Sequence, residues 1–393
     1  MRIWHVTDSY APVVGGIEVH VSALAAHQQA QGHQVRVLTL TPAGSTSDDG
    51  RHPVPVTRLT TTSGGETVHL EPHRVVGLGA DVRRLLDADP GGRPDVLHVH
   101  ASVVSPLALG ALRAARETRT PAVVTVHSMW SGLGPLPWLA RHGLGLDGFD
   151  AVWSAVSHPA ADALAPLVGA RPVRVLPNAV DPAGWDGAPA PRHDGVHLVS
   201  VMRLTRVKRA VPLAEVLREV RRLVPSDVPV RATVAGAGPR GDRLAAYVRR
   251  HRMTDWVDLP GVLDRDRVRA LLLDADAFVA PAVRESFGIA ALEARASGVP
   301  VVAPRASGVT EFVRHEVEGL LADDDADLAR QLARLCTDDA LRLRMRRHNA
   351  TTPVRHDWEL ACRGSAALYE EAAALLGVRL PVVLVPRAVE VAS

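Results

Sequence analysis

The sequence predicts an α/β protein in which two doubly wound parallel sheets follow one another along the chain. Apolar runs of strand length alternate with helical patterns almost throughout, which is typical of parallel sheets covered by helices on both faces. The alternation restarts after a stretch rich in Pro, Gly and Asp at 178–195, which we interpret as an interdomain linker. The length of 393 residues also exceeds that of a typical single domain.

The first half of the chain is expected to form an N-terminal domain at 1–180. Its predicted strands lie at 2–8, 33–40, 96–100, 122–127, 151–156 and 172–176. Its predicted helices lie at 16–31, 75–87 and 103–117. Each strand is an apolar run bounded by turn residues, and each helix repeats apolar residues at helical spacing.

The second half is expected to form a C-terminal domain at 181–354. Its predicted strands lie at 196–202, 230–235, 257–259, 277–280 and 299–303, with helices between them. A final helix at about 355–376 follows Pro353 and is long enough to cross back to the first domain. The Val- and Pro-rich tail at 378–393 either adds an edge strand or extends freely.

Composition excludes several classes of protein. The chain is 47% hydrophobic and 22% charged with a formal net charge of +2, which argues against disorder and against general binding of nucleic acids. Two cysteines, Cys336 and Cys362, are too few for a disulfide framework, so we expect a reduced, cytoplasmic protein. The opening residues lack the apolar core of a signal peptide, and no apolar run has the length of a membrane span.

Lys208 is the one lysine among 45 basic residues. Arginine replaces lysine elsewhere in this chain, so this position suggests a site that needs a compact charge on a flexible stem. Chance survival of one codon is the alternative. Arg203 lies five residues earlier, just after a predicted strand, and we place Lys208 at the start of a helix. Two cations on one loop can neutralise a diphosphate, although they can also be solvated charges.

Glycines follow two of the predicted strands. Gly15 and Gly16 come after the first strand, where backbone N–H groups can approach a phosphate or a sugar, or simply form a tight turn. The run from Gly236 to Gly241 has the spacing of a dinucleotide fingerprint. It follows the second strand of its domain, and Pro239 suits a first helical position, so nicotinamide binding is not favoured. These glycines still fit the floor of a nucleotide cleft.

The most specific cluster runs from Glu285 to Glu293. Glu285 ends the loop after a strand, and Gly288 with Ile289 opens a helix whose N–H groups can hold phosphate oxygens. The two carboxylates, eight positions apart, can accept hydrogen bonds from the hydroxyls of a hexose and of a ribose. Complementing the helix dipole is the alternative role for these acids.

In order and spacing, these residues resemble the retaining glycosyltransferases of family 4, which have the GT-B fold. The resemblance covers most of the chain and includes motifs at 12–18, 32–33, 95–100, 125–127, 177–181, 203–208, 236–239, 285–293, 298–300, 311, 319–321, 358 and 369. It implies two Rossmann-like domains that face a central cleft. The N-terminal domain would bind the acceptor, and the C-terminal domain would bind the nucleotide-sugar donor.

The resemblance also implies roles for charged residues. Arg203 and Lys208 would bind the donor diphosphate, Glu285 would contact hydroxyls of the donor sugar, and Glu293 would contact the ribose. His127 matches the family histidine near the anomeric centre and the C6 hydroxyl, although a buried core histidine is the alternative. Further contacts with the donor would come mainly from backbone groups of Gly15, Gly16, Gly236, Val262, Phe287, Gly288 and Ile289.

The chain departs from the family pattern at two places. Met202 and Arg209 stand where the family usually has glycines beside the arginine and the lysine, and we expect a wider loop there. Ser307 with Gly308 replaces the more usual glycine pair, which would reshape the donor-sugar end of the site. Neither change removes a charge that the chemistry requires.

Three other clusters are not expected to bind metal. Asp274 and Asp276 have the spacing of a metal-dependent transferase motif, but Asp276 is expected to cap or enter a strand. The acidic run at 323–325 is expected to start a helix. His98 and His100 share one face of a strand, but no third ligand is near in sequence.

The expected activity is transfer of a hexose or amino-hexose from a nucleotide diphosphate to a hydroxyl acceptor, with retention of the anomeric configuration and without a metal or other cofactor. UDP is favoured over GDP. Acceptor recognition falls to loops at 41–53, 61–72 and 129–147, where residues 133–146 suit a lid over a small acceptor better than a membrane contact. A nucleotide-sugar epimerase and a non-catalytic nucleotide-sugar-binding protein are the alternatives.

Overall fold

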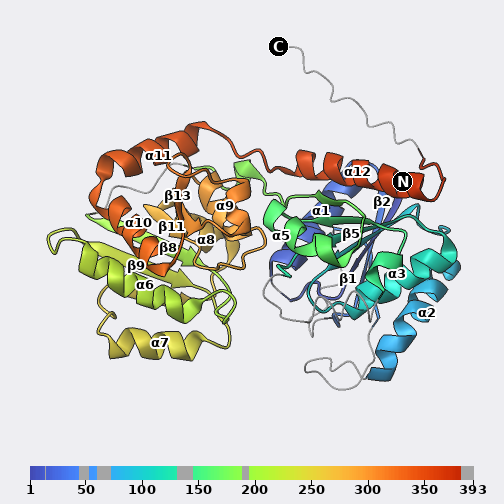
Figure 1. Cartoon of the computed structure of the whole chain (residues 1–393), viewed down its shortest axis with the longest axis horizontal. Coiled ribbons are helices and arrows are strands. Elements are labelled where there is room, and N and C mark those ends of the chain that lie inside the picture. The colour runs from blue at the N-terminus through green and yellow to red at the C-terminus, as the bar shows by residue number, and fades with distance from the viewer. Residues whose placement is uncertain (14, 44–52, 60–71, 131–144, 188–193, 382–393) are drawn as a thin grey trace, which may run out of the picture. The chain divides into compact units, whose positions relative to one another are not determined.

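The computed structural model describes residues 1–13, 15–43, 53–59, 72–130, 145–187 and 194–381. Internal contacts divide the chain into unit 1, which comprises Met1–Asn178 and Trp358–Ser393, and unit 2, which comprises Ala179–Asp357. Each unit is a parallel sheet with helices packed against it, as Figure 1 shows, so the predicted α/β class is confirmed. Within the described parts of the chain, no helix is both long enough and apolar enough to cross a bilayer.

The sheet of unit 1 has seven parallel strands within the described residues, in the order β3-β2-β1-β4-β5-β6-β7. The strands are β1 (Arg2–Thr7), β2 (Gln34–Thr39), β3 (Val56–Arg58), β4 (Val96–Ala101), β5 (Ala122–Val126), β6 (Val152–Ala155) and β7 (Val173–Val175). All match predicted strands except β3. This short edge strand is only half-buried, so it lacks the apolar run that identified the others.

Helices cover both faces of this sheet (Figure 1). They are α1 (Gly16–Ala30), α2 (Pro72–Ala88), α3 (Pro106–Thr118), α5 (His158–Leu164) and α12 (Trp358–Leu375). Alternate residues of β1 enter different cores: Ile3 packs with α1 and α12, and Trp4 packs with α2 and α3. The final helix therefore returns to unit 1, as expected, whereas the short α5 was not predicted.

The sheet of unit 2 has six parallel strands in the described residues, in the order β10-β9-β8-β11-β12-β13. They are β8 (Val196–Val201), β9 (Val230–Ala235), β10 (Val257–Gly261), β11 (Ala277–Val279), β12 (Val301–Pro304) and β13 (Gly319–Ala322). The sequence predicted all but β13. A Cβ at Gly319 would lie 1.9 Å from the Val301 carbonyl oxygen, so this strand pairs too closely for a side chain at its first position.

The helices of unit 2 are α6 (Ala210–Leu223), α7 (Gly241–Arg250), α8 (Arg265–Leu273), α9 (Ile289–Ala296), α10 (Asp325–Thr337) and α11 (Asp339–Thr351). One core joins the apolar sides of α6 and α10 to the sheet through residues such as Leu213, Leu217 and Leu332. Helix α9 contacts β11 and β12 instead. Its first turn therefore starts at the carboxyl ends of the strands.

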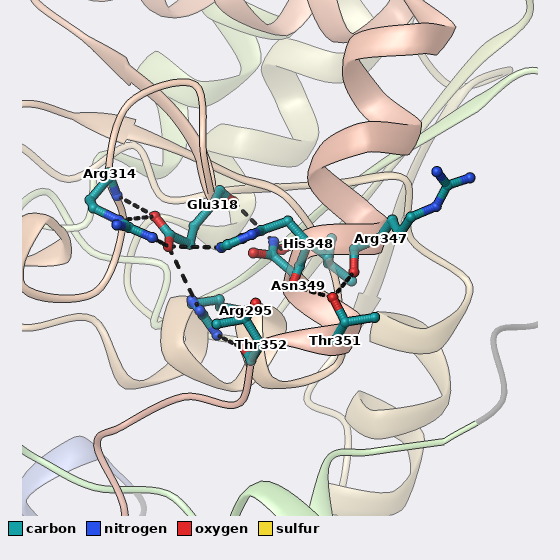
Figure 2. Close-up of polar contacts among 9 residues, drawn as sticks. Arg295, Arg314, Glu318, Arg347, His348, Asn349, Thr351 and Thr352 are labelled. Atoms are coloured by element: carbon teal, nitrogen blue, oxygen red, sulfur yellow. Dashed lines mark hydrogen bonds and ion pairs between the residues drawn. The ribbon is translucent and has the colours of Figure 1, made fainter.

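A polar cluster fixes the C-terminal end of α9 (Figure 2). The buried carboxylate of Glu318 accepts hydrogen bonds from Arg314 and from His348, the latter at 3.1 Å, and the Arg295 guanidinium lies 3.9 Å away. Arg295 also donates to the Thr352 carbonyl oxygen at 3.2 Å. Burial of Glu318 opposes ionisation, but the hydrogen bonds from Arg314 and His348 outweigh it and lower its pKa to about 2. The cluster holds α9 against α11.

Candidate functional site

The predicted donor-binding residues of unit 2 follow the carboxyl ends of β8, β9, β10 and β11. Because the strands are parallel, these ends share one edge of the sheet, which is where open α/β sheets bind ligands. The loops after β8 and β11 are neighbours because those two strands pair directly. This pairing brings together two motifs that are about 80 residues apart in the sequence.

Lys208 and Glu285 form the central contact of this edge. The Lys208 Nζ donates to both carboxylate oxygens of Glu285, at 2.8 Å and 2.6 Å. The Glu285 side chain is 12% exposed and the Lys208 side chain is 33% exposed, so the pair is only partly accessible to water. Lys208 lies two residues before α6, because Arg209 caps that helix, so our placement of Lys208 at the helix start was slightly early.

Arg203 extends from the loop after β8 and is exposed. Its neighbour Leu204 is buried and exchanges backbone hydrogen bonds with the glycine loop, at 2.8 Å to the Ala237 carbonyl and 2.8 Å from the Arg240 N–H. A Cβ at Gly236 would lie 1.9 Å from the Met202 carbonyl oxygen, and the φ of Gly236 is +134°. Gly236 therefore lets two loops approach closely and fixes the backbone on either side of Arg203.

Arg209 explains one departure from the family pattern. Its φ is +60°, in the left-handed region that favours glycine. The arginine found here instead donates to Asp325 at 2.6 Å and to the Pro281 carbonyl oxygen at 3.3 Å. Its guanidinium therefore ties the loop after β8 to the start of α10. The wider loop that we expected from Met202 and Arg209 stays a prediction.

The segment from Glu285 to Ile289 enters α9 through Gly288, whose φ is +92°. The first N–H groups of a helix have no acceptor within the helix and favour a negative charge, so Gly288 and Ile289 suit a phosphate. The Phe287 ring is only 1% exposed and packs against Phe312, with ring centroids 5.3 Å apart. Phe287 thus contributes its side chain to the core and leaves its backbone to the loop.

Gly308 supports the Glu285 loop from behind. Its N–H donates to the Glu285 carbonyl oxygen at 2.8 Å. A Cβ at Gly308 would lie only 2.1 Å from the Ser286 carbonyl oxygen. The buried Ser307 hydroxyl donates to the Pro304 carbonyl oxygen at 2.7 Å, so this residue holds the preceding turn. Gly308 therefore determines the position of Glu285, whereas Ser307 stabilises the turn that begins at Pro304.

Glu293 and Val262 have different environments. Glu293 lies a turn inside α9 and is partly buried, and desolvation raises the pKa of its carboxyl to about 7, against the opposing charge of Arg265. A carboxyl with such a shift beside a candidate site indicates function. Val262 follows β10 and is 73% exposed, so it is accessible to a ligand.

Gly15 and Gly16 lie at the start of α1 in unit 1. A Cβ at Gly15 would lie 2.4 Å from a carboxylate oxygen of Glu18, so this glycine makes room for that side chain. Glu18 is buried and accepts a hydrogen bond from the Ser9 hydroxyl at 2.5 Å. The hydrogen bond between Ser9 and Glu18 therefore closes the turn that leads into α1. Residue 14, between Val13 and Gly15, lies outside the described residues.

His127 immediately follows β5 and is 7% exposed. Its Nε2 lies 3.0 Å from the Nδ1 of His100, and the His100 Nε2 lies 2.9 Å from the Nδ1 of His5. The ring of His20, from α1, lies 5.4 Å from that of His127. The sequence identified His127 alone. The signal for its neighbours was the spacing of His98 and His100, because parallel strands set such residues side by side on one face.

His5, His98 and His100 bring three ring nitrogens within 4.8 Å of one another, which is close enough to consider a metal. Sequence reading found no third ligand, but the register of β1 and β4 sets His5 beside His98. The His5–His100 nitrogen distance of 2.9 Å is shorter than the roughly 3.3 Å between two nitrogens on a tetrahedral zinc ion. Both ring nitrogens of each histidine also have hydrogen-bond partners. The geometry is that of hydrogen-bonded imidazoles.

The acidic clusters have structural roles, as expected. Asp276 accepts the His197 backbone N–H at 2.9 Å. Asp274 accepts hydrogen bonds from the side chains of Arg231 and His197. Asp324 caps α10 by accepting the Asp327 N–H at 2.7 Å. The predicted acceptor loops lie largely outside the described residues, at 44–52, 60–71 and 131–144, as does the tail at 382–393.

Known proteins match this chain along almost its whole length. Residues 14–183 match the family described as Glycosyltransferase Family 4, and residues 186–352 match Glycosyl transferases group 1. The glycogen synthase of Mycobacterium tuberculosis is 30% identical over 97% of both chains. The chain belongs to the GT-B glycosyltransferases.

Two further proteins extend the comparison. This glycosyltransferase is 30% identical to a component of the phosphatidylinositol N-acetylglucosaminyltransferase of Arabidopsis thaliana, over 84% of this chain and 73% of the relative. Its fold matches that of the Anabaena protein HepE in complex with UDP-glucose, with a TM-score of 0.73, 20% identity, and coverage of 94% of this chain and 100% of that chain.

Proposed function

We propose that this glycosyltransferase transfers a hexose or amino-hexose from a nucleotide diphosphate, UDP in preference to GDP, to a hydroxyl acceptor with retention of configuration. The observation that carries the proposal is the contact of Lys208 Nζ with both Glu285 oxygens, which brings a phosphate-binding cation and a sugar-binding carboxylate to one point. The relatives include a glycogen synthase and a component of an N-acetylglucosaminyltransferase, and a neighbour of the same fold holds UDP-glucose.

The donor diphosphate is stabilised by charge from the chain itself. As the bond between the sugar C1 and the phosphate oxygen breaks, its electron pair goes to the phosphate, where negative charge grows. Lys208, Arg203 and the N–H groups at the start of α9 stabilise that charge, and such donors act most strongly where charge develops. Because these groups supply positive charge, the proposal needs no metal ion. Activity that survives chelation of divalent cations is the expected result.

The carboxylates orient the donor. Glu285 accepts hydrogen bonds from sugar hydroxyls, and Lys208 neutralises it in the free protein. Glu293 accepts hydrogen bonds from the ribose hydroxyls in its ionised form. Val262, exposed after β10, contacts the base through its backbone. Because His127 matches the family histidine, we also assign it a contact with the donor sugar.

Retention follows if the acceptor attacks from the face that the phosphate leaves. The acceptor oxygen forms the new bond to C1, and its proton passes to the departing phosphate oxygen. This route needs no dedicated base from the protein. A double displacement would need a carboxylate nucleophile, and the motifs assign Glu285 and Glu293 to binding hydroxyls.

A donor panel tests the proposal. UDP-glucose, UDP-N-acetylglucosamine and GDP-mannose are each incubated with the full chain, with and without a glucan oligomer or a polyol phosphate, and free nucleotide is measured. Acceptor-dependent release of UDP, with the anomeric configuration of the donor kept in the product by NMR, supports it. Interconversion of the donor without an acceptor indicates an epimerase. Binding without turnover across the panel indicates a binding protein, and an inverted product contradicts retention.

A further inference from the structure

His127 ends a continuous chain of buried hydrogen bonds inside unit 1. The chain runs through side chains of β4, β1, α1, α12, β5 and β6, on the face of the sheet that α1 and α12 cover. In order, its members are His127, His100, His5, Gln28, Tyr369, His98, Thr125, Ser154 and the Val124 carbonyl. Most of these groups can either donate or accept a hydrogen bond. The direction of the bonds is therefore determined only if one group at an end of the chain can act in a single way.

The Val124 carbonyl provides that fixed end, because a carbonyl oxygen only accepts. The Ser154 hydroxyl donates to it at 3.1 Å, which uses the only proton on that hydroxyl. The Ser154 oxygen must then accept from the Thr125 hydroxyl, 2.8 Å away. The Thr125 oxygen in turn accepts from the Nε2–H of His98 at 2.8 Å.

The direction continues through Tyr369 and orients Gln28. A neutral His98 with its proton on Nε2 accepts at Nδ1, so the Tyr369 hydroxyl donates to it at 2.8 Å. The Tyr369 oxygen is then free to accept from the Gln28 amide N–H at 3.0 Å. The Gln28 amide oxygen therefore faces His5. The carbonyl at the far end thus determines the orientation of an amide that is otherwise ambiguous.

The direction of the remaining hydrogen bonds fixes the proton on His127. The His5 Nε2–H donates to the Gln28 amide oxygen at 2.8 Å, which leaves the His5 Nδ1 to accept from the His100 Nε2–H at 2.9 Å. The His100 Nδ1 then accepts from the His127 Nε2–H at 3.0 Å. Every bond in the chain donates away from His127. Its proton is on Nε2, and its lone pair is on Nδ1.

Burial keeps these imidazoles neutral, as the argument requires. Desolvation lowers the pKa of His127 and of His5 to about 4 and the pKa of His98 and His100 well below the usual value. The ring packed against His127 from α1 is His20, whose pKa burial also lowers well below the usual value. A neutral ring carries one proton, so each bond passes its direction to the next.

We propose that Gln28, His5 and His100 are positioning residues that hold His127 as the Nε2–H tautomer, in which Nδ1 carries the lone pair. This inference rests on the proposed function for the role of His127 in the reaction. His127 in this form supplies no proton to the leaving phosphate.

The tautomer is measured directly on the full chain without any ligand. Protein labelled with ¹⁵N-histidine gives long-range ¹H–¹⁵N spectra in which the protonated and unprotonated ring nitrogens resonate far apart, and the His127 signals are assigned by their loss in His127→Asn. The expected result at pH 7.5 is a neutral His127 with its proton on Nε2. A Nδ1–H tautomer, an imidazolium or a copurified metal on these rings overturns the inference.

Gln28→Met tests the chain at a distance, because Gln28 is separated from His127 by two other histidines. Without the amide oxygen, His5 loses its acceptor, and His127 is expected to become a mixture of tautomers. Gln29→Met is the matched control, since the neighbouring Gln29 is exposed and donates only to the Pro53 carbonyl among the interactions described. An unchanged tautomer in Gln28→Met overturns the inference.

Tyr369→Phe is a second variant that keeps the ring and its packing in case Gln28→Met folds poorly. It cuts the chain between His98 and Gln28, so the amide can turn over and the His127 tautomers are again expected to mix. In either variant, kcat is expected to fall about tenfold while the donor KM stays within about twofold. A mixed tautomer with unchanged kcat overturns the positioning role. A wild-type chain without transferase activity contradicts the proposed function instead, and the spectra still decide this inference.

Discussion

The two units use opposite kinds of polar chemistry. In unit 2, charged side chains such as Lys208, Arg203 and Glu285 lie on loops beyond the strand ends, where water reaches them in part. In unit 1, neutral imidazole rings such as those of His5 and His98 lie between the sheet and the helices and are fully buried. In the absence of a ligand, a charged side chain needs solvent or a counter-charge to stabilise it. A neutral imidazole ring can be fully buried when its nitrogens are hydrogen-bonded.

Lys208→Ala is expected to have the largest effect and tests the charged unit most severely. Loss of one transition-state charge donor should lower turnover by roughly two to three orders of magnitude. Initial rates of UDP release with a saturating acceptor measure it. Arg206→Ala, at an exposed position on the same loop, is the matched control and is expected to stay near the wild-type rate. A Lys208→Ala rate equal to that of the control removes Lys208 from the site.

Gly308→Ala is expected to have the next largest effect, because it displaces Glu285 without touching a charged side chain. The new Cβ would meet the Ser286 carbonyl oxygen at 2.1 Å, so the loop must move, at a cost of about 1–3 kcal/mol in unfolding free energy. The donor KM should rise about tenfold or more. Gly77→Ala, in α2, is the control, since a Cβ there meets nothing within 4 Å. Equal donor KM values for the two variants would show that the Glu285 loop tolerates the shift.

The pH dependence near 7 should come from Glu293 of unit 2, because burial lowers the pKa of His5 and His127 to about 4 and the pKa of His98 and His100 well below the usual value. Glu293 keeps its proton in the folded protein up to about pH 7, against an ordinary pKa of 4.5. Donor binding to its carboxylate should weaken as pH falls below 7, by up to about tenfold per pH unit. Donor KM measured from pH 5.5 to 8 checks this expectation.

The raised pKa of Glu293 also predicts how the free energy of unfolding changes with pH. Because the pKa of Glu293 is higher in the folded state, ionising it costs the folded state, and the free energy of unfolding falls as pH rises from about 4.5 through 7. Glu293→Gln should remove this fall and raise the Tm at pH 8, while it weakens donor binding. Glu215→Gln, at an exposed position of α6, is the control and should change neither quantity. A pH-dependent KM that persists in Glu293→Gln would assign the titration to another group.

Arg209→Gly is expected to have the smallest effect, since two changes oppose each other. Glycine adopts a φ of +60° without backbone strain, but the variant loses the hydrogen bonds to Asp325. The net change in unfolding free energy should lie within about 1 kcal/mol. Chemical denaturation of Arg209→Gly and of Asp325→Asn separates the two contributions, because Asp325→Asn removes only the ion pair. A loss in Arg209→Gly well above that in Asp325→Asn would show that the guanidinium has a further role.

The chemistry of unit 2 was predictable from the sequence because it lies on motifs. Strand ends, glycines and the single lysine all mark loops, and loops at the carboxyl ends of parallel strands meet at one edge. Lys208 and Glu285 were therefore singled out before their contact was known. What the motifs did not reveal is the support beneath them: Gly236 and Gly308 act by letting backbones approach, which only the tertiary structure shows.

The chemistry of unit 1 was mostly not predictable from one sequence. The buried hydrogen bonds join Gln28 to Tyr369, which are separated by more than 300 residues in the sequence. No local sequence pattern predicts such a contact. His5 became the neighbour of His98 through strand register. The strands β3 and β13 were missed for a related reason, since a half-buried edge and a close-packed glycine both hide the apolar run that predicts a strand.

A crystal structure of the full chain with a UDP-hexose would show whether the donor binds at the carboxyl ends of β8 and β11. We expect the diphosphate within hydrogen-bond distance of Lys208, Arg203 and the Ile289 N–H, with a sugar hydroxyl on Glu285. A donor bound away from the carboxyl ends of β8 and β11, or one whose phosphates contact neither Lys208 nor Arg203, would contradict it.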